Sequence, residues 1–139
     1  MHETLREKIN WRPRLRSASL IVCALLLLSQ VAWASAIMTA SWYSEASLRK
    51  DGQWAKTKGV MANGKHFTDS GYTAASCLYT IGSRLRITNL RTNKTVVVEV
   101  TDRTARRFKY TRVDLSPAAF DKIADRKQGI VSVKIEEIK

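Results

Sequence analysis

The stretch Thr95-Val-Val-Val-Glu-Val-Thr-Asp102-Arg103 is the most informative part of this 139-residue sequence. Its run of β-branched side chains is typical of a β-strand. The predicted strand ends on a carboxylate, and a strand end is a rigid support on which an acidic group can be presented. Asp and Arg also close many strands as solvated turn residues. The stretch by itself therefore leaves both a catalytic and a structural role open for Asp102.

The N-terminal residues have the three parts of a secretory signal peptide. Five Lys and Arg residues lie within residues 1–16, the apolar run 20–28 follows them, and the small residues Ala34 and Ala36 form a cleavage site. The apolar run is shorter than the about 20 residues that a membrane span needs. We expect a leader of residues 1–36 that is cleaved after Ala36, with Ala34 as the second choice and an uncleaved anchor as the alternative.

The remaining residues, 37–139, are enough for one small domain with one hydrophobic core. They contain 19 Lys and Arg residues and 10 Asp and Glu residues, which gives a net charge of +9. An exported protein with this charge is expected to meet an anionic surface or polymer, such as cell-wall glycan with its carboxylates or an anionic membrane. Export excludes intracellular nucleic acid, so no nucleic-acid partner is predicted.

Cysteine and histidine are scarce after residue 36. Cys77 is the one cysteine of this segment, so no disulfide forms within it, and we interpret Cys77 as a small buried residue rather than a nucleophile. His66 is the one histidine, and residues 37–139 hold no cluster of Cys and His with metal-ligand spacing. The prediction is a protein without a metal or other cofactor.

The hydropathy pattern predicts about six short strands and one short helix, and a small closed barrel is the natural way to hide the edges of such strands. Alternating apolar residues at 84–89 and 130–138 are typical of strands with one buried face. Ser116 is the expected N-cap of the helix, and Pro117 its first residue. Residues 44–58 are polar and aperiodic, so we expect a loop there. The further predictions are extended segments at 37–43, 59–64, 71–77, 96–100 and 111–115, turns at Asn63-Gly64 and 90–94, and the helix at 118–125.

Six short motifs, taken in order along the chain, resemble those of one family. The motifs are Ala40-Ser-Trp-Tyr43, Met61-Ala-Asn-Gly64, Thr73-Ala-Ala-Ser76, Leu85-Arg-Ile-Thr-Asn-Leu90, Val98-Glu-Val-Thr-Asp-Arg103 and Val113-Asp-Leu-Ser116. Together they resemble the double-psi β-barrel domain of the rare lipoprotein A (RlpA) family over nearly all of residues 39–138. The resemblance implies a mainly β fold, a six-stranded double-psi β-barrel with one short helix, over residues 37–139 after the signal peptide.

The resemblance also implies a lytic endotransglycosylase, which cleaves peptidoglycan glycan strands at the N-acetylmuramic acid bond and leaves 1,6-anhydro ends. In such an enzyme one carboxylate can serve first as acid and then as base, whereas most glycosidases that use water need a second carboxylate. Asp102 matches the strand-end aspartate of the family and is the expected acid and base. Asp114 matches an aspartate of the related expansins. It is either a second catalytic or substrate-binding carboxylate or a structural residue before the helix.

The same resemblance indicates residues that bind the glycan. Arg103 is expected to orient Asp102 or to pair with substrate carboxylates, because a guanidinium suits bidentate pairing. The expected substrate-binding residues are Tyr43, Asn63, Lys65, His66, Ser76 and Arg103, and the aromatic residues expected to stack on sugars are Trp42, Tyr43, Trp54 and Tyr72.

Four residues at three sites differ from the family's catalytic members, which carry Glu, His and Gly-Pro where this chain has Lys65, Ser76 and Thr104-Ala105. The alternative function is therefore a non-catalytic, expansin-like module that binds peptidoglycan. In either case we expect a monomer in the bacterial periplasm or cell envelope, bound to peptidoglycan glycan strands, with envelope or division proteins as further candidate partners.

Overall fold

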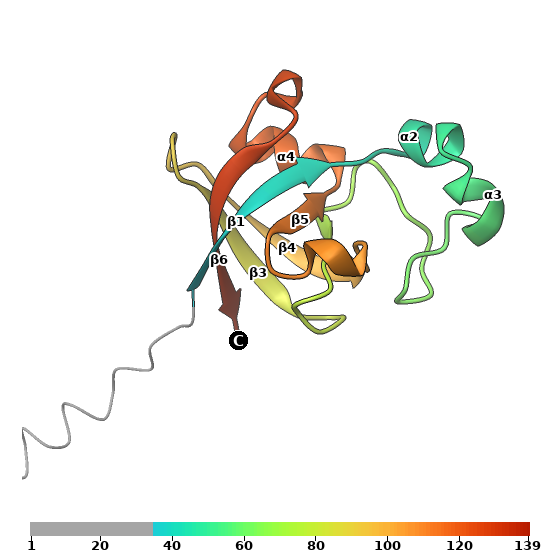
Figure 1. Ribbon diagram of the computed structural model, residues 1–139, viewed down its shortest axis with the longest axis horizontal. Coiled ribbons are helices and arrows are strands. Elements are labelled where there is room, and N and C mark those ends of the chain that lie inside the picture. Colours follow the sequence, from blue (N-terminus) through green and yellow to red (C-terminus); the bar gives the residue numbers. More distant parts are fainter. Residues whose placement is uncertain (1–34) are drawn as a thin grey trace, which may run out of the picture. The chain divides into compact units, whose positions relative to one another are not determined.

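Six β-strands close into a barrel in the computed structural model of the protein, which describes residues 35–139 (Figure 1). Neighbouring strands follow the order β1-β5-β2-β4-β3-β6, and β6 pairs with β1 to close the barrel. The strands are β1 (Ser35–Trp42), β2 (Thr73–Ala75), β3 (Arg84–Asn89), β4 (Thr95–Asp102), β5 (Arg112–Leu115) and β6 (Val131–Ile138). The predicted signal peptide lies, up to residue 34, outside the described residues.

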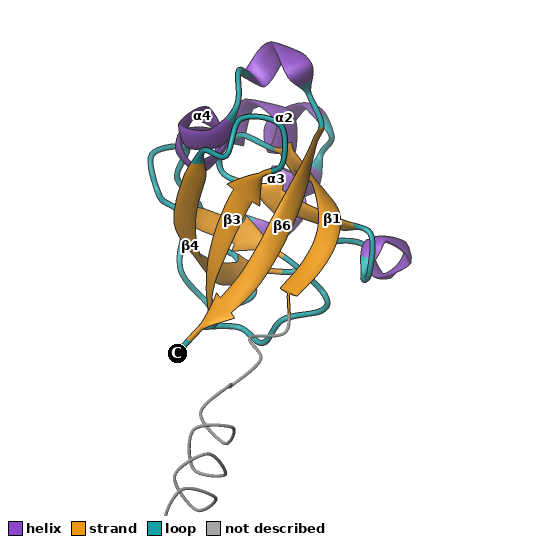
Figure 2. Cartoon of the chain, turned by 90° about the vertical axis from the view of Figure 1, so that its left-hand side faces the viewer, coloured by secondary structure: helices purple, strands orange, loops and turns teal. Residues whose placement is uncertain are grey.

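The barrel combines parallel and antiparallel strand pairs. β1 lies parallel to β5 and β2 lies parallel to β4, whereas β6 is antiparallel to both β1 and β3. Figure 2 shows β4, β3, β6 and β1 along one wall of the barrel. On the other wall, β5 and β2 pair with each other and connect β1 to β4. Segments that are far apart in the sequence therefore lie next to each other in this second wall.

Alternation along the strands explains which residues fill the barrel. Val96, Val98 and Val100 of β4 are at most 7% exposed, while the residues between them face outward. Full burial of a side chain of this size stabilises the fold by about 1.5–3 kcal/mol. The short helix α4 (Pro117–Ile123) adds Phe120 and Ile123 to the same core.

The structure confirms the predicted strands at 84–89, 96–100, 111–115 and 130–138 to within two residues. The predicted helix after Ser116 is also present as α4. Ser116 stands at the N-cap position, but its hydroxyl donates to the Gly71 carbonyl instead of accepting from the first turn of α4. Residues 59–64 form only an isolated bridge, between Val60 and His66, so the extended segment predicted there is not a strand of the barrel.

Residues 44–58, expected as a loop, contain two short helices that stand apart from the barrel (Figure 1), α2 (Glu45–Lys50) and α3 (Gln53–Thr57). At the start of α2 the Ser44 hydroxyl accepts from Ser47 N at 3.1 Å, and the Ser47 hydroxyl accepts from Ser44 N at 2.9 Å. Neither helix has a fully buried residue. The segment therefore carries no amphipathic period, and hydropathy alone gave no sign of its helices.

Candidate active site

One row of paired residues crosses four strands of the barrel. On one side, Ser41 of β1 pairs with Asp114 of β5. On the other side, Ala75 of β2 pairs with both Asp114 and Asp102 of β4. Because neighbouring strands are about 4.8 Å apart, the Cα atoms of the two aspartates lie roughly 10 Å apart across β2. The register thus brings both predicted catalytic carboxylates to one region of the barrel.

Asp102 is the last residue of β4, at the strand end where the sequence predicted it. Its Oδ1 accepts hydrogen bonds from two main-chain groups, Ala62 N at 3.1 Å and Arg103 N at 2.8 Å. Its second oxygen, Oδ2, accepts no hydrogen bond from residues 35–139. The residue is only half-buried. Asp102 therefore presents a carboxylate that is held by one oxygen and open to a ligand at the other.

Asp114 is held by side chains instead of by the main chain. Its Oδ1 accepts a hydrogen bond from the Ser41 hydroxyl, and Arg112 Nε lies 3.0 Å from the same oxygen as an ion pair. The Arg112 guanidinium also lies 3.6 Å above the centre of the Phe108 ring. The Asp114 side chain is 17% exposed. Asp114 is therefore engaged by a cation and a hydroxyl on one oxygen, which makes it a less free group than Asp102.

Tyr43 follows β1 and lies close to both aspartates. Its phenol oxygen is buried and has no hydrogen-bond partner within residues 35–139. Burial raises the pKa of Tyr43 well above its ordinary value, and the negative charges of Asp102 and then Asp114 raise this pKa further. The ring stacks on Phe67, with 4.6 Å between ring centroids. The geometry thus groups two carboxylates around a phenol that keeps its proton.

The segment of residues 59–67 lies against the end of β4. Asn63 N donates to the Thr101 carbonyl at 3.1 Å, while the Asn63 side-chain oxygen accepts from Lys65 N at 3.0 Å. The Asn63 side chain is therefore used within its own turn. Lys65 and His66 are exposed, and neither side chain forms a hydrogen bond or ion pair with any residue from 35 to 139. Both are open to a ligand, but no contact joins them to the aspartates.

Two expected substrate-binding residues have structural partners. Ser76 is fully buried, and its hydroxyl accepts from Leu78 N at 3.1 Å. A side chain without exposed surface does not reach a glycan, so the expectation that Ser76 binds substrate needs correction. The Arg103 guanidinium donates to the Ser76 carbonyl at 2.8 Å and to the Tyr79 carbonyl at 2.6 Å. Arg103 therefore holds the chain after β2, and its main-chain N–H, not its guanidinium, orients Asp102.

The aromatic residues expected to stack on sugars differ in how free they are. Trp42 packs against the core, and its Nε1 donates to the Arg126 carbonyl at 3.2 Å. Trp54 packs on Gly59, and the Arg49 guanidinium lies 4.0 Å above its ring. Tyr72, by contrast, is 47% exposed. Of these three rings, Tyr72 has the most surface available to a sugar.

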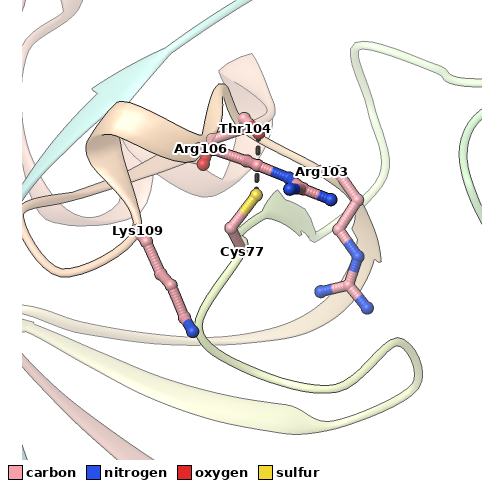
Figure 3. A pocket seen from close by; sticks show the side chains of 5 residues that line it. All are labelled: Cys77, Arg103, Thr104, Arg106 and Lys109. Atoms are coloured by element: carbon pink, nitrogen blue, oxygen red, sulfur yellow. Dashed lines mark hydrogen bonds between the residues drawn. The ribbon is translucent and has the colours of Figure 1, made fainter.

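A basic pocket lies directly beyond Asp102 and was not predicted from the sequence. It has a volume of about 540 Å³ and is lined by Cys77, Arg103, Thr104, Arg106 and Lys109 (Figure 3). Cys77 is half-buried, and its Sγ donates to the Thr104 carbonyl at 2.8 Å, so the expectation of a simple buried residue was incomplete. The sequence signal that could have indicated this pocket is charge, because residues 103–112 contain five Lys and Arg residues and no Asp or Glu.

Within residues 35–139, no group of three or more His, Cys, Asp and Glu side chains is arranged to hold a metal ion. No helix in the same range is long and apolar enough to cross a membrane.

Comparison with known sequences gives a consistent set of relatives. A family model described as "Lytic transglycolase" matches residues 35–135. The endolytic peptidoglycan transglycosylase RlpA of Rickettsia felis is 39% identical over 98 residues, which are 70% of this chain and 40% of that protein. The protein of the same name from Neisseria meningitidis serogroup B is 37% identical over 111 residues, which are 79% of this chain and 42% of that protein. The chain thus spans less than half the length of these transglycosylases.

Comparison with solved structures gives the fold. A papain inhibitor from Streptomyces has a TM-score of 0.59 at 20% identity, over 76% of this chain and 96% of that one. The expansin of Clavibacter michiganensis has a TM-score of 0.55 at 21% identity, over 76% of this chain and 51% of that one. A variant of this expansin in complex with cellohexaose has a TM-score of 0.54. Together with the family match, these likenesses confirm the predicted six-stranded double-psi β-barrel.

Proposed function

The chain belongs to the lytic transglycosylase family that includes the RlpA proteins, and on this basis we propose that it is a lytic endotransglycosylase of peptidoglycan. The observation that carries the proposal is the state of Asp102. Two main-chain N–H groups hold its Oδ1, while its Oδ2 has no partner among residues 35–139. A carboxylate in this arrangement can exchange a proton with a bound glycan without losing its own position.

The proposed reaction uses the Asp102 carboxyl group twice, first as the acid and then as the base. The protonated carboxyl gives its proton to the glycosidic oxygen as the bond from that oxygen to C1 of N-acetylmuramic acid breaks. The C6 hydroxyl oxygen of the same sugar then bonds to C1, and its proton passes to the Asp102 carboxylate. This step closes the 1,6-anhydro ring and restores the acid, so no water and no second nucleophile are consumed.

Asp114 and Tyr43 have supporting roles in this proposal. Asp114 stays paired with Arg112 at 3.0 Å and places a negative charge on the other side of β2, where it stabilises positive charge that develops at C1. The Tyr43 hydroxyl keeps its proton because burial and both aspartates raise its pKa. It therefore stays a neutral group between the two carboxylates and adds no negative charge to the site.

The test of this proposal is product analysis with three matched carboxylate variants. The protein is incubated with purified sacculi, and 1,6-anhydro muropeptides are quantified by mass spectrometry. Asp102→Asn is expected to lower product formation by about 100-fold or more, because it removes the acid and base. Asp114→Asn is expected to retain a measurable fraction of activity. Glu99→Gln changes an exposed carboxylate of the same strand and is expected to leave activity unchanged.

Two results would contradict different parts of this proposal, the role of Asp102 and the transglycosylase activity. If Asp102→Asn forms products as fast as the parent protein, Asp102 is not the acid and base. If the parent protein forms no anhydro products at all, the chain is not a lytic transglycosylase on this substrate.

The second candidate is a non-catalytic module that binds peptidoglycan. The observation that favours it is the solvent-exposed Lys65 at a position where the catalytic members of the family carry Glu, together with Ser76 in place of His. The barrel likeness to an expansin whose structure contains cellohexaose fits the same function. Binding to sacculi without release of anhydro products, equal in the parent protein and in Asp102→Asn, is the outcome that selects this candidate.

The cellular setting is also part of the proposal. A protein of this family with a secretory leader and a basic mature chain suits the bacterial periplasm or cell envelope. We infer a monomer that meets peptidoglycan glycan strands there, with envelope or division proteins as further partners.

A further inference from the structure

The basic pocket beside Asp102 is built around the connection between the two aspartate-bearing strands. This connection contains the 3₁₀ helix η1 (Arg106–Phe108), and Thr111 N donates to the Phe108 carbonyl at 3.1 Å to close its turn. Phe108 is also fixed by Arg112, whose guanidinium lies over its ring. The backbone that carries Arg106 and Lys109 is therefore anchored to β5 and to the side chain that pairs with Asp114.

The pocket carries positive charge that the protein itself does not neutralise. Neither Arg106 nor Lys109 has a carboxylate oxygen within 4.0 Å among residues 35–139, and neither side chain donates a hydrogen bond to a residue in that range. Figure 3 shows their side chains extending from the turn around η1 on the two sides of the Cys77 sulfur. Two cations that share one pocket repel each other, and a bound anion relieves this repulsion.

The pocket also has a defined place relative to the proposed acid. Arg103 lines it and is the residue that follows Asp102, to whose carboxylate it donates a main-chain hydrogen bond. Cys77 lines it and follows Ser76, whose N–H donates to the Asp102 carbonyl at 3.0 Å. The pocket therefore adjoins the backbone of Asp102, on the chain segments that follow Ser76 and Asp102.

We propose that this pocket is an anion subsite, formed by Arg106 and Lys109, that receives a carboxylate attached to the glycan held at Asp102. The inference rests on the proposed function, because it identifies the pocket as part of the same substrate-binding surface. The guanidinium of Arg106 suits bidentate pairing with a planar carboxylate, and the Lys109 ammonium adds a second charge from the far end of η1. The subsite makes the protein selective for strands whose carboxylates are free.

The experiment compares two forms of one ligand and two matched double variants. Soluble peptidoglycan strands are used either with free carboxylates or after their carboxylates have been converted to amides. Binding of the full chain is measured at about 0.3 M salt, where long-range attraction is largely screened. The pocket variant is Arg106→Gln with Lys109→Gln. The control variant is Arg84→Gln with Lys94→Gln, which removes the same charge from two exposed residues that do not line the pocket.

The parent protein is expected to bind free-carboxylate strands about tenfold more tightly than amidated strands, because amidation removes one charged pair. The pocket variant is expected to bind both forms equally, and the control variant is expected to keep the tenfold difference. A pocket variant that discriminates like the parent overturns the subsite. Absence of any binding or cleavage by the parent is a different result, which overturns the proposed function.

A second measurement separates a carboxylate from a phosphate as the natural anion. Alkylation of Cys77 by the uncharged reagent iodoacetamide is followed by mass spectrometry, with N-acetyl-D-alanine or inorganic phosphate added at equal ionic strength. The carboxylate is expected to slow alkylation at least about twofold more than phosphate does, because it occupies the pocket beside the sulfur. Stronger protection by phosphate overturns the carboxylate assignment.

Discussion

Tyr43 shows how single residues set the chemistry of this site. Its hydroxyl is buried, has no partner among residues 35–139, and lies near the charges of Asp102 and Asp114. An unpaired buried hydroxyl costs free energy in the folded protein, roughly 1–3 kcal/mol for a typical group. The environment of the Tyr43 hydroxyl therefore depends on side chains that are far apart in the sequence, at positions 43, 102 and 114.

The alkaline stability of Tyr43→Phe tests this environment. Because the folded state raises the pKa of Tyr43, the folded protein keeps a proton that the unfolded chain loses above pH about 10. The parent protein is therefore destabilised relative to Tyr43→Phe as the pH rises above 10, by about 1.4 kcal/mol per pH unit. Below pH 9 the difference in unfolding free energy between the two proteins is expected to be constant. Urea unfolding from pH 7 to 11.5 measures it.

Tyr110→Phe is the matched control for this measurement. The Tyr110 ring is 67% exposed, so its substitution is expected to leave the alkaline profile of the parent unchanged. A constant difference between Tyr43→Phe and the parent over the whole pH range contradicts the burial of the phenol beside the two aspartates.

At the scale of elements, the segment of residues 44–67 is the part of the fold that reaches the site from outside the barrel. It contributes Ala62 N to Asp102 and Phe67 to the stack with Tyr43. Its outer part is held by Trp54, which covers Gly59. Gly59 has φ +75°, and a Cβ placed there lies 2.5 Å from Trp54 Cη2. Glycine is therefore required at this position both by backbone conformation and by the packing of the indole.

Gly59→Ala and Gly64→Ala separate these two requirements. Both glycines have positive φ, but a Cβ at Gly64 meets no atom within 4 Å. Gly64→Ala is expected to cost about 1–2 kcal/mol of unfolding free energy from the left-handed backbone alone. Gly59→Ala is expected to cost at least about 1 kcal/mol more, because the Trp54 ring has to move. Urea unfolding of both variants measures the difference.

The Trp54→Ala background provides the control for this comparison. Without the indole, Gly59→Ala is expected to cost no more than Gly64→Ala, as a double-mutant cycle reveals. Equal costs of the two glycine substitutions in the parent background contradict the close packing of Trp54 on Gly59.

At the scale of the whole molecule, closure of the barrel assembles the site. Asp102 and Asp114 come from strands that do not pair with each other, and β2 is the strand that joins them. Residues 37–139, which include this small barrel, carry a net charge of +9. Charge of this size attracts an anionic polymer before any specific contact forms.

The salt dependence of binding to sacculi tests this contribution. Bound protein is measured by co-sedimentation as sodium chloride rises from about 0.05 to 0.5 M, over which the screening length falls from roughly 14 to 4 Å. The affinity is expected to fall by about tenfold or more, because capture by net charge is screened. The double variant Arg84→Gln with Lys94→Gln is expected to show a shallower fall. An affinity independent of salt contradicts a role for net charge in capture.

Much of the fold could be predicted because its signals are local. The run of β-branched residues predicted β4, Ser116-Pro117 predicted the start of α4, and the end of the β-branched run predicted the strand-end position of Asp102. The helices at 45–57 could not be predicted from hydropathy, because they bury no face. The six motifs also indicated the family, which the comparisons confirmed.

The candidate site was only partly predictable, because the partners of its side chains are distant in the sequence. The sequence indicated Asp102 and Asp114 as candidate site residues. It did not indicate that Ala75 of β2 pairs with both of them and lies between them in the barrel. They also did not predict the burial of Ser76 or the carbonyl partners of Arg103. Each of these facts depends on which strand lies next to which.

The sequence by itself determined most of the strands, the helix α4, the strand end at which Asp102 stands, and the surplus of positive charge. These features follow from the spacing of side chains and from turn chemistry, which act over a few residues. Only the tertiary structure decided that β2 lies between β4 and β5, that Tyr43 lies beside both aspartates, and that residues 103–112 surround Cys77 with cations. Strand pairing is a long-range choice made by closure of the barrel and burial of its core, so no local pattern specifies it.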